Sequence, residues 1–147
     1  MARPFRFSLE RVLDYRIQLE EQAKLALAKA QHAYTRQSDF VQSLRALLDE
    51  HEAKLHSDEN LTPQAMWLWR NYKERLLQDL AQAEALLLTL ARELNTRRRE
   101  AVERSKDKKL LEKLKENQAA RHALDEQTRE QNEYDEMATL RYQPRSF

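Results

Sequence analysis

The sequence predicts an all-α protein, a long antiparallel two-helix coiled-coil hairpin, and three observations support this fold class. The 147 residues include no Gly and only 3 Pro, so the residues that punctuate folds with many turns are almost missing. Residues that favour helices are abundant, and apolar residues recur at helical spacing. A single turn-like segment, residues 57–62, interrupts this spacing in the interior. We therefore expect one coiled-coil domain over residues 1–147.

The composition argues against several classes of function. The 26 basic and 25 acidic residues leave a net charge of +1, which gives no global field to attract nucleic acid or an anionic membrane. Without Cys the chain has no disulfide, thiolate nucleophile or Cys-ligated zinc. No apolar run approaches the roughly 20 residues that span a bilayer, and the charged N-terminus lacks the apolar core of a secretion signal. We expect a soluble, cytoplasmic protein.

The first helix is expected over about residues 8–56. Ser8 is placed to cap the free amides of the first turn, and Phe7 and Val12 have the spacing of a hydrophobic staple. A seven-residue repeat then predicts a seam against a second helix. This predicted seam contains Leu9, Val12, Leu19, Ala23, Ala26, Ala30, Ala33, Phe40, Leu44 and Leu47, with Arg16, Gln37 and His51 as polar interruptions.

The second helix is expected over about residues 63–142. Thr62 followed by Pro63 is typical of a helix N-cap with proline at the first helical position, and Leu61 and Met66 repeat the staple spacing. The helix should end near Tyr142, before the next proline. Its seam is predicted to lose phase across residues 104–108. The seam residues are Trp69, Leu76, Leu80, Ala83, Leu87, Leu90, Leu94 and Ala101, and then Leu110, Leu114 and Leu124.

The short turn makes the two helices antiparallel, so that facing residues should have numbers that add to roughly 120. This register places the small side chains of Ala23 to Ala33 opposite Leu87 to Leu94, as close packing requires. The second helix is much longer than the first. Its end, from about Lys115 to Tyr142, is therefore predicted to have no partner in the chain. We expect this thinly apolar segment to fray or to dock on another protein.

No catalytic, cofactor or metal site is expected. The four histidines, His32, His51, His56 and His122, are dispersed, and none forms the spaced pair with a flanking Glu that marks a helical zinc site. The carboxylates lie on helices that offer no pocket, and no Gly-rich loop is present to hold a phosphate. The sequence therefore favours binding over catalysis.

One basic cluster gives the alternative hypothesis, a nucleic-acid-binding or scaffold coiled coil that uses Arg97 to Arg99. Basic stripes contact phosphates and give salt-dependent binding. Acidic residues interleave with this cluster, however, and no aromatic side chain is present to stack on bases. A solvated face or an acidic protein partner is the favoured interpretation. The cluster contains Arg97, Arg98, Arg99, Arg104, Lys106, Lys108 and Lys109.

Two tryptophans follow the turn, and a helix can bury only one of them in the seam. They are two positions apart, about 200° of rotation, and Trp69 has the phase of the seam. Trp67 either packs on the loop of residues 58–61 or is an exposed anchor for a partner. Doubled apolar positions widen the stripe beyond what one helix covers. These are Phe40/Val41, Leu47/Leu48, Leu76/Leu77 and Leu86/Leu87/Leu88.

Three segments resemble the flagellar type III export protein FliJ family: PFRFSLERVLDYR, WLWRNYKERLLQDLAQAE and DKKLLEKLKENQAARHALDEQTREQNEYDEMA. The resemblance covers nearly the whole chain, and stalk proteins of virulence type III secretion are a near alternative. It implies a coiled coil similar to the central stalk of rotary ATPases, inserted into a hexameric export ATPase. The partners implied are that ATPase, an export gate membrane protein and empty substrate chaperones, at the cytoplasmic side of the inner membrane.

The stalk hypothesis assigns two sets of contact residues. The resemblance implies gate contacts on the loop-proximal halves of both helices, where the apolar stripe is widest, and ATPase contacts at the terminal end. For the ATPase we expect contacts by Phe5, Phe7, Tyr134, Met137 and Leu140. For the gate we expect contacts by Phe40, Leu44, Leu48, Trp67 and Leu76.

Overall fold

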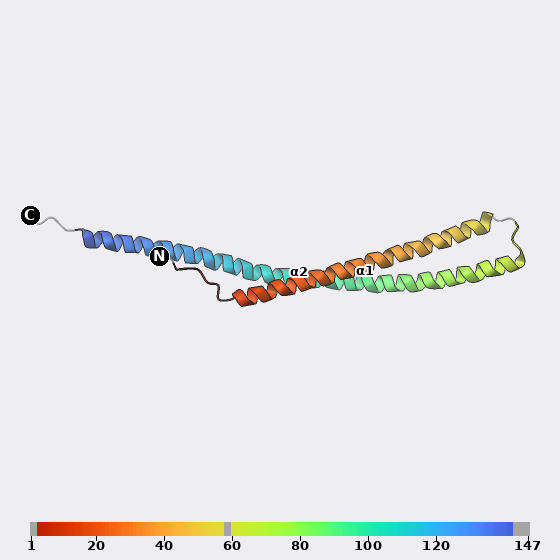
Figure 1. The fold of residues 1–147 in the computed structure, drawn as a ribbon, viewed down its shortest axis with the longest axis horizontal. Helices are drawn as coiled ribbons and strands as arrows, with labels where there is room; N and C mark the ends of the chain where they lie inside the picture. Colours follow the sequence, from red (N-terminus) through yellow and green to blue (C-terminus); the bar gives the residue numbers. More distant parts are fainter. Residues whose placement is uncertain (1–2, 58–59, 143–147) are drawn as a thin grey trace, which may run out of the picture. The chain divides into compact units, whose positions relative to one another are not determined.

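The computed structural model describes residues 3–57 and 60–142, most of which form two long helices, and this confirms the predicted all-α hairpin. Helix α1 spans Glu10–Ser57 (48 residues) and helix α2 spans Pro63–Arg141 (79 residues), as Figure 1 shows. The chain forms two compact units. Unit 1 contains Met1–Glu20 and Glu103–Phe147, and unit 2 contains Glu21–Val102. In both units the helices run antiparallel.

The helix starts agree with the sequence at α2 and differ at α1. The Ala65 amide donates to Thr62 Oγ1 at 3.2 Å, so the predicted cap is confirmed. Helix α1 instead begins at Glu10, whose amide donates to the Phe7 carbonyl at 3.2 Å. A turn at residues 8 and 9 thus precedes the helix where Ser8 was predicted to start it.

The core of unit 2 is the seam between the helices near the turn. Four buried apolar side chains form it, and Gln37 and His51 add hydrogen bonds across the helices. Gln37 Nε2 donates to the Ala83 carbonyl at 3.0 Å, and His51 Nε2 donates to the Trp69 carbonyl at 3.0 Å. Both pairs fit the predicted sum of roughly 120. The buried side chains are Val41, Leu44, Leu76 and Ala83, with Leu48, Leu80 and Leu87 packed against them.

The predicted seam of the first helix is partly wrong. At every second seam position the residue that packs against α2 is the one directly after the predicted residue. Phe40 and Leu47 are exposed, whereas the residues after them, Val41 and Leu48, pack in the core. One residue is about 100° of rotation, so either member of a doubled apolar pair continues the repeat that includes Leu44. The position of α2 decides between them. The same shift exposes Val12 and Leu9 and buries Leu13, and it buries Glu20 more deeply than Leu19.

The predicted loss of phase in the second helix is also wrong. In unit 1 the seam continues without interruption through Lys108, Leu111 and Lys115. Leu110, Leu114 and Leu124, which were predicted to carry it, are exposed instead. Polar residues occupy the seam here because they have partners on α1. Lys108 Nζ lies 2.9 Å from Glu20 Oε1, and Lys115 Nζ lies 2.8 Å from Glu10 Oε2.

Residues 3–9, here called the N-terminal strap, continue the contacts of unit 1 beyond the start of α1. Phe7 is buried in a cluster with Leu13 and Leu111, so it does not staple to the exposed Val12. His122 Nε2 donates to the Arg3 carbonyl at 2.8 Å, and the Phe5 and His122 ring centroids are 5.7 Å apart.

The strap shortens the segment of α2 that lacks a partner in the chain. The prediction that this segment begins near Lys115 is wrong, since Lys115 pairs with Glu10 and His122 with the strap. Every described residue from 127 to 142 is exposed. These residues, 127–142, are called the overhang below.

Candidate partner-binding surfaces

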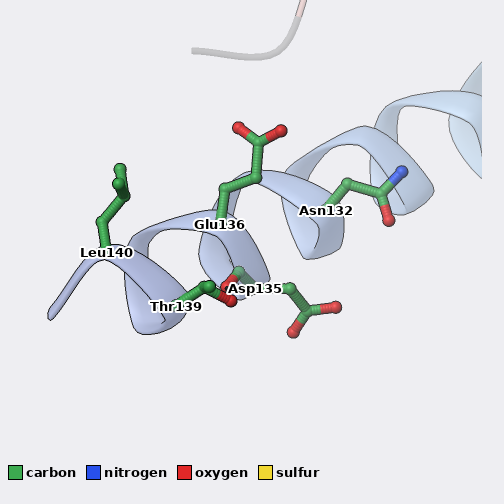
Figure 2. A pocket seen from close by; sticks show the side chains of 5 residues that line it. All are labelled: Asn132, Asp135, Glu136, Thr139 and Leu140. Carbon is green, nitrogen blue, oxygen red and sulfur yellow. Dashed lines mark hydrogen bonds between the residues drawn. The ribbon is translucent and has the colours of Figure 1, made fainter. Parts of the chain in front are cut away.

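One surface depression lies on the overhang and is bordered by a single helix. Figure 2 shows the side chains that line it, namely Asn132, Asp135, Glu136, Thr139 and Leu140. Small-molecule sites bury most of their ligand between several elements, which one helix cannot do. This depression is therefore a helix face open to solvent, and it suits a partner larger than a small molecule.

No group of three or more His, Asp or Glu side chains in residues 3–57 and 60–142 is placed to hold a metal ion. In the same ranges, no helix has the length and apolar character needed to cross a membrane.

One side of unit 2, here called the ion-pair flank, is closed by polar contacts between the helices. Arg45 Nη2 donates to Glu84 Oε1 at 2.8 Å, and Arg98 Nη2 donates to Gln31 Oε1 at 3.2 Å. Arg45 and Glu84 each directly follow a buried seam residue, and so both project to the same side of the hairpin. Leu77 and Leu88, 44% and 56% exposed, also directly follow seam residues, so this flank carries apolar side chains beside its ion pair.

The opposite side of unit 2, here called the apolar flank, carries Phe40 and Leu47 on α1 and Tyr72 and Leu86 on α2. Each of these side chains is 43% to 50% exposed. Each directly precedes a buried or half-buried residue, whereas Arg45 directly follows one, so the two sets project to opposite sides. Such flank positions are usually charged in a two-helix coiled coil. Asp79 lies in the same row, seven residues after Tyr72, so the flank also carries one charge. The exposed apolar side chains around it are suited to bind another protein.

The start of α2 adds exposed apolar surface. Trp67 is 64% exposed and lines a depression with Pro63 and Leu68, which favours the exposed-anchor alternative. Part of the loop on which it could have packed lies outside the described residues. Trp69 has the seam phase as predicted, since its ring lies 4.1 Å from that of the buried His51.

The five predicted gate residues differ in how accessible their side chains are. Phe40 and Trp67 are exposed, but Leu44 and Leu76 are buried in the core of unit 2, and Leu48 packs against that core. Leu44 and Leu76 thus hold the hairpin together and offer no accessible surface.

Other residues supply that surface instead. Leu47 had been assigned to the seam, and Leu86 was noted only as part of a doubled apolar position. Tyr72 was missed by the sequence reasoning. The sequence feature that indicates Tyr72 is its position directly before a seam residue. This feature can be recognised only when the phase of the seam is known.

The five predicted ATPase-contact residues also fall into two groups. Tyr134, Met137 and Leu140 lie on the overhang and are all exposed, with Leu140 at 84%. Phe7 is buried and Phe5 is half-buried in the strap, where both pack on unit 1. The overhang side chains are available to a partner, and the two phenylalanines chiefly hold the strap.

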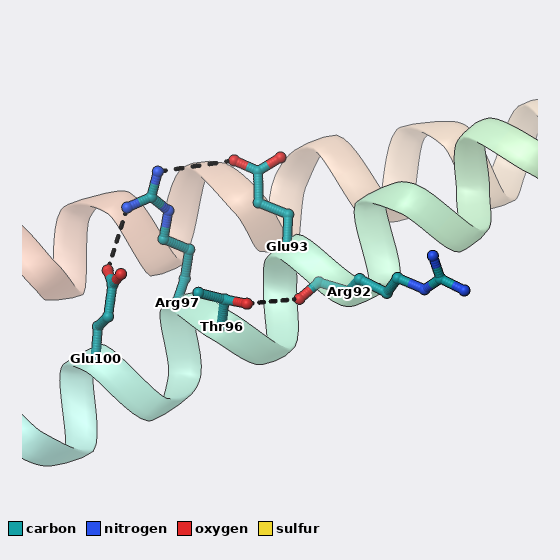
Figure 3. Close-up of polar contacts among 5 residues, drawn as sticks. All are labelled: Arg92, Glu93, Thr96, Arg97 and Glu100. Carbon is teal, nitrogen blue, oxygen red and sulfur yellow. Dashed lines mark hydrogen bonds and ion pairs between the residues drawn. The ribbon is translucent and has the colours of Figure 1, made fainter.

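Four of the seven side chains in the basic cluster contact nearby acceptors. Figure 3 shows Arg97 between Glu93 and Glu100, at 3.8 and 3.1 Å. Lys106 lies 3.7 Å from Glu103. Lys108 and Arg98 are engaged across the helices as described above. These contacts place carboxylates where phosphates would have to bind, and so they disfavour the nucleic-acid alternative.

A comparison with protein families agrees with the architecture described above. The family model described as flagellar FliJ protein matches residues 5–146. No curated protein and no solved structure matches the chain significantly. The family match spans both helices, residues 5–9 of the strap, the apolar flank and the overhang. The chain therefore belongs to the flagellar FliJ protein family.

Proposed function

We propose that this protein is a non-enzymatic stalk of the flagellar export apparatus that couples a hexameric export ATPase to the export gate. Family membership supports a role in flagellar protein export. The observation that carries the stalk assignment is the overhang, a helical segment whose described residues are all exposed. Because α2 continues for several turns beyond the last contact that residues 3–57 make with it, this segment is free to enter another assembly.

The overhang is the proposed ATPase end. Tyr134, Met137 and Leu140 are spaced three residues apart and so share one side of the helix. Around them the surface is polar, which keeps the free segment soluble and leaves a narrow apolar stripe for binding. A ring of subunits can surround a single helix on all sides, so complete exposure suits such a partner.

The apolar flank is the proposed gate end. Phe40, Leu47, Tyr72 and Leu86 form a half-exposed apolar face on unit 2, and Trp67 adds a large exposed ring near the turn. Aromatic side chains of this kind dominate the energy of many protein interfaces. Leu44 and Leu76 support the face from the core. The same surface offers a place for empty substrate chaperones, and binding to the gate would hold the protein at the inner membrane.

The test uses two sets of substitutions in the full chain and two readouts. Phe40→Glu should reduce binding to the cytoplasmic domain of the gate by at least tenfold, because it places a charge in the apolar flank. Replacing Tyr134, Met137 and Leu140 with Ser should abolish stimulation of the export ATPase. Each variant should keep the other activity, since the two surfaces belong to different units.

Leu25→Glu is the matched control. Leu25 is exposed on α1 in unit 2, as Phe40 is, but it lies one residue before the row of positions 26, 33, 40 and 47, which is about 100° of rotation away from the side chains of the apolar flank. This variant should bind the gate domain as the wild type does. The proposal fails if Phe40→Glu and Leu25→Glu behave alike, or if the overhang variant stimulates ATP hydrolysis normally. Binding that collapses between low and moderate salt in every variant would instead favour the nucleic-acid alternative.

A further inference from the structure

The strap takes over from α1 on one side of α2. Helix α1 starts at Glu10, whose carboxylate lies 2.8 Å from Lys115 Nζ. The strap continues along α2 as far as His122, where His122 Nε2 donates to the Arg3 carbonyl at 2.8 Å. The Phe5 ring contacts the His122 ring there, with a centroid distance of 5.7 Å. Lys115 and His122 are seven residues apart and share a helix face, so the strap extends the seam by about two turns.

The two ends of the strap are held unequally. At its base, Phe7 is 8% exposed and packs in the apolar cluster of unit 1. At its far end, Phe5 and His122 are only half-buried, and the side chains of residues 3 and 4 are exposed. Residues 3–7 form neither helix nor strand. Terminal segments with few buried contacts open at a low free energy, so the far end should open while Phe7 stays in place.

The face of α2 that the far end of the strap covers continues onto the overhang. A row of residues spaced by three, four or seven positions shares this face. The first two members are half-buried and the last three are exposed. Arg129 lies beside the row and bridges its two glutamates, at 4.0 and 3.6 Å. The row consists of His122, Glu126, Glu133, Met137 and Leu140.

We propose that the strap is a releasable cover that sets how much of α2 is bare, and that binding of the export ATPase at the overhang opens it. This inference deepens the proposed function and rests on it. With the strap closed, the bare segment is the overhang, which is roughly 24 Å long. With residues 3–6 released, the bare segment begins at about residue 116 and is roughly 40 Å long.

The strap and the ATPase compete for the same face of α2 at His122. A partner that packs along the row from Leu140 displaces Phe5 when it reaches His122. If the open form makes up about 10% of the free protein, the apparent affinity is about tenfold weaker than that of a fully open protein. Locking the strap should therefore weaken ATPase binding further. Phe7 keeps the strap attached, so the cover can close again after release.

The first test measures opening directly, by pulsed electron paramagnetic resonance. Nitroxide labels on Arg3→Cys and Arg121→Cys report on the far end, because the Arg3 carbonyl bonds His122 and both labelled side chains are exposed. The distance between these labels should be short in the free protein and should lengthen in the complex with the ATPase hexamer. Labels on Asp14→Cys and Lys109→Cys are the control, since both lie on the paired helices of unit 1. The control distance should not change.

The second test locks the strap. Phe5→Cys with His122→Cys supplies two thiols in a chain that has no other Cys, and a short bismaleimide joins them. The same variant with each thiol capped separately by N-ethylmaleimide is the matched control. The cross-linked protein should need at least a fivefold higher concentration than the capped protein for half-maximal stimulation of ATP hydrolysis. Melting curves should show that both forms stay folded. Equal concentrations would overturn the proposal.

The label distance separates this inference from the proposed function. If the ATPase is bound and stimulated while the Arg3 to Arg121 label distance stays short, the releasable strap is overturned and the stalk assignment stands. If the strap opens on ATPase binding but replacement of Tyr134, Met137 and Leu140 with Ser leaves stimulation normal, the proposed role of the overhang is overturned alone. A wild type that does not bind the ATPase overturns both.

Discussion

Glu20 and Lys108 form an ion pair inside the seam of unit 1, with Lys108 Nζ 2.9 Å from Glu20 Oε1. The two side chains are only 4% and 20% exposed. A buried pair must offset the loss of hydration of both charges, so it contributes little net stability compared with an apolar pair of similar size. Its main effect is on register, because any slip of α1 along α2 leaves a buried charge against an apolar neighbour.

Breaking this pair should therefore destabilise unit 1. We expect Lys108→Ala to lower the free energy of unfolding by about 2 to 4 kcal/mol, since a carboxylate that stays buried loses an opposite charge. Replacing Glu20 and Lys108 together with Leu should be neutral or stabilising. Lys106→Ala is the control, because its exposed pair with Glu103 should contribute less than about 1 kcal/mol. Chemical denaturation measures all three, and equal effects of Lys108→Ala and Lys106→Ala would contradict the prediction.

The seam of unit 2 should respond to loss of volume. Leu94 is buried, and Leu94→Ala should cost about 2 to 4 kcal/mol of stability because it leaves a cavity between the helices. Leu88 is exposed on the same helix, and Leu88→Ala should change stability by less than about 0.5 kcal/mol. Thermal unfolding followed by circular dichroism tests the pair. If both variants melted like the wild type, the assignment of Leu94 to the seam would be contradicted.

Replacing Thr with Ala should affect stability differently at the N-cap of α2 and in the interior of the same helix. Thr62→Ala removes the hydrogen bond from the Ala65 amide to Thr62 Oγ1 and should cost about 1 kcal/mol. Thr96 lies within α2, where its hydroxyl donates to the Arg92 carbonyl at 3.1 Å (Figure 3). Thr96→Ala should be neutral or slightly stabilising, because Ala favours the helix interior. The urea midpoint should therefore fall for Thr62→Ala and stay the same or rise for Thr96→Ala, and an equal loss of stability in both variants would speak against a cap at Thr62.

The sequence predicts the helices of this protein better than it predicts which residues face each other. Helix α2, its cap and its seam from Trp69 to Ala101 follow from local signals, namely Thr62, Pro63 and a clear apolar repeat. On α1 the apolar residues are doubled at Phe40/Val41 and Leu47/Leu48, so two phases fit the repeat equally well. The position of the partner helix chooses between them, and that is a tertiary effect.

Polar seam residues explain why the contacts of unit 1 were missed. Hydrophobic periodicity cannot identify Lys108 or Lys115 as seam residues, because each depends on a carboxylate about 90 or more residues away in sequence. The pairing of Arg3 with His122 is equally non-local. The same limit applies to the binding surfaces. Tyr72 became a candidate only when the burial of its neighbours showed which side of α2 it occupies.

Deletion of Tyr134 to Phe147 should separate stability from function. The described residues of this segment are all exposed, so their removal takes almost no apolar area from the seam. We expect the free energy of unfolding to change by less than about 0.5 kcal/mol. Deletion of Met1 to Phe7 is the matched contrast, because it removes the buried Phe7 and should cost about 3 kcal/mol.

The truncated protein should melt cooperatively and bind the gate domain through the apolar flank, but it should no longer stimulate ATP hydrolysis by the hexameric ATPase. Amide exchange gives a second measurement. Residues 127–142 should exchange fast in the free protein, because no other part of the described chain covers them, and should be protected in the complex. If the deletion unfolds the hairpin, the overhang has a structural role. If the truncated protein stays folded and stimulates the ATPase normally, the ring binds elsewhere on the chain.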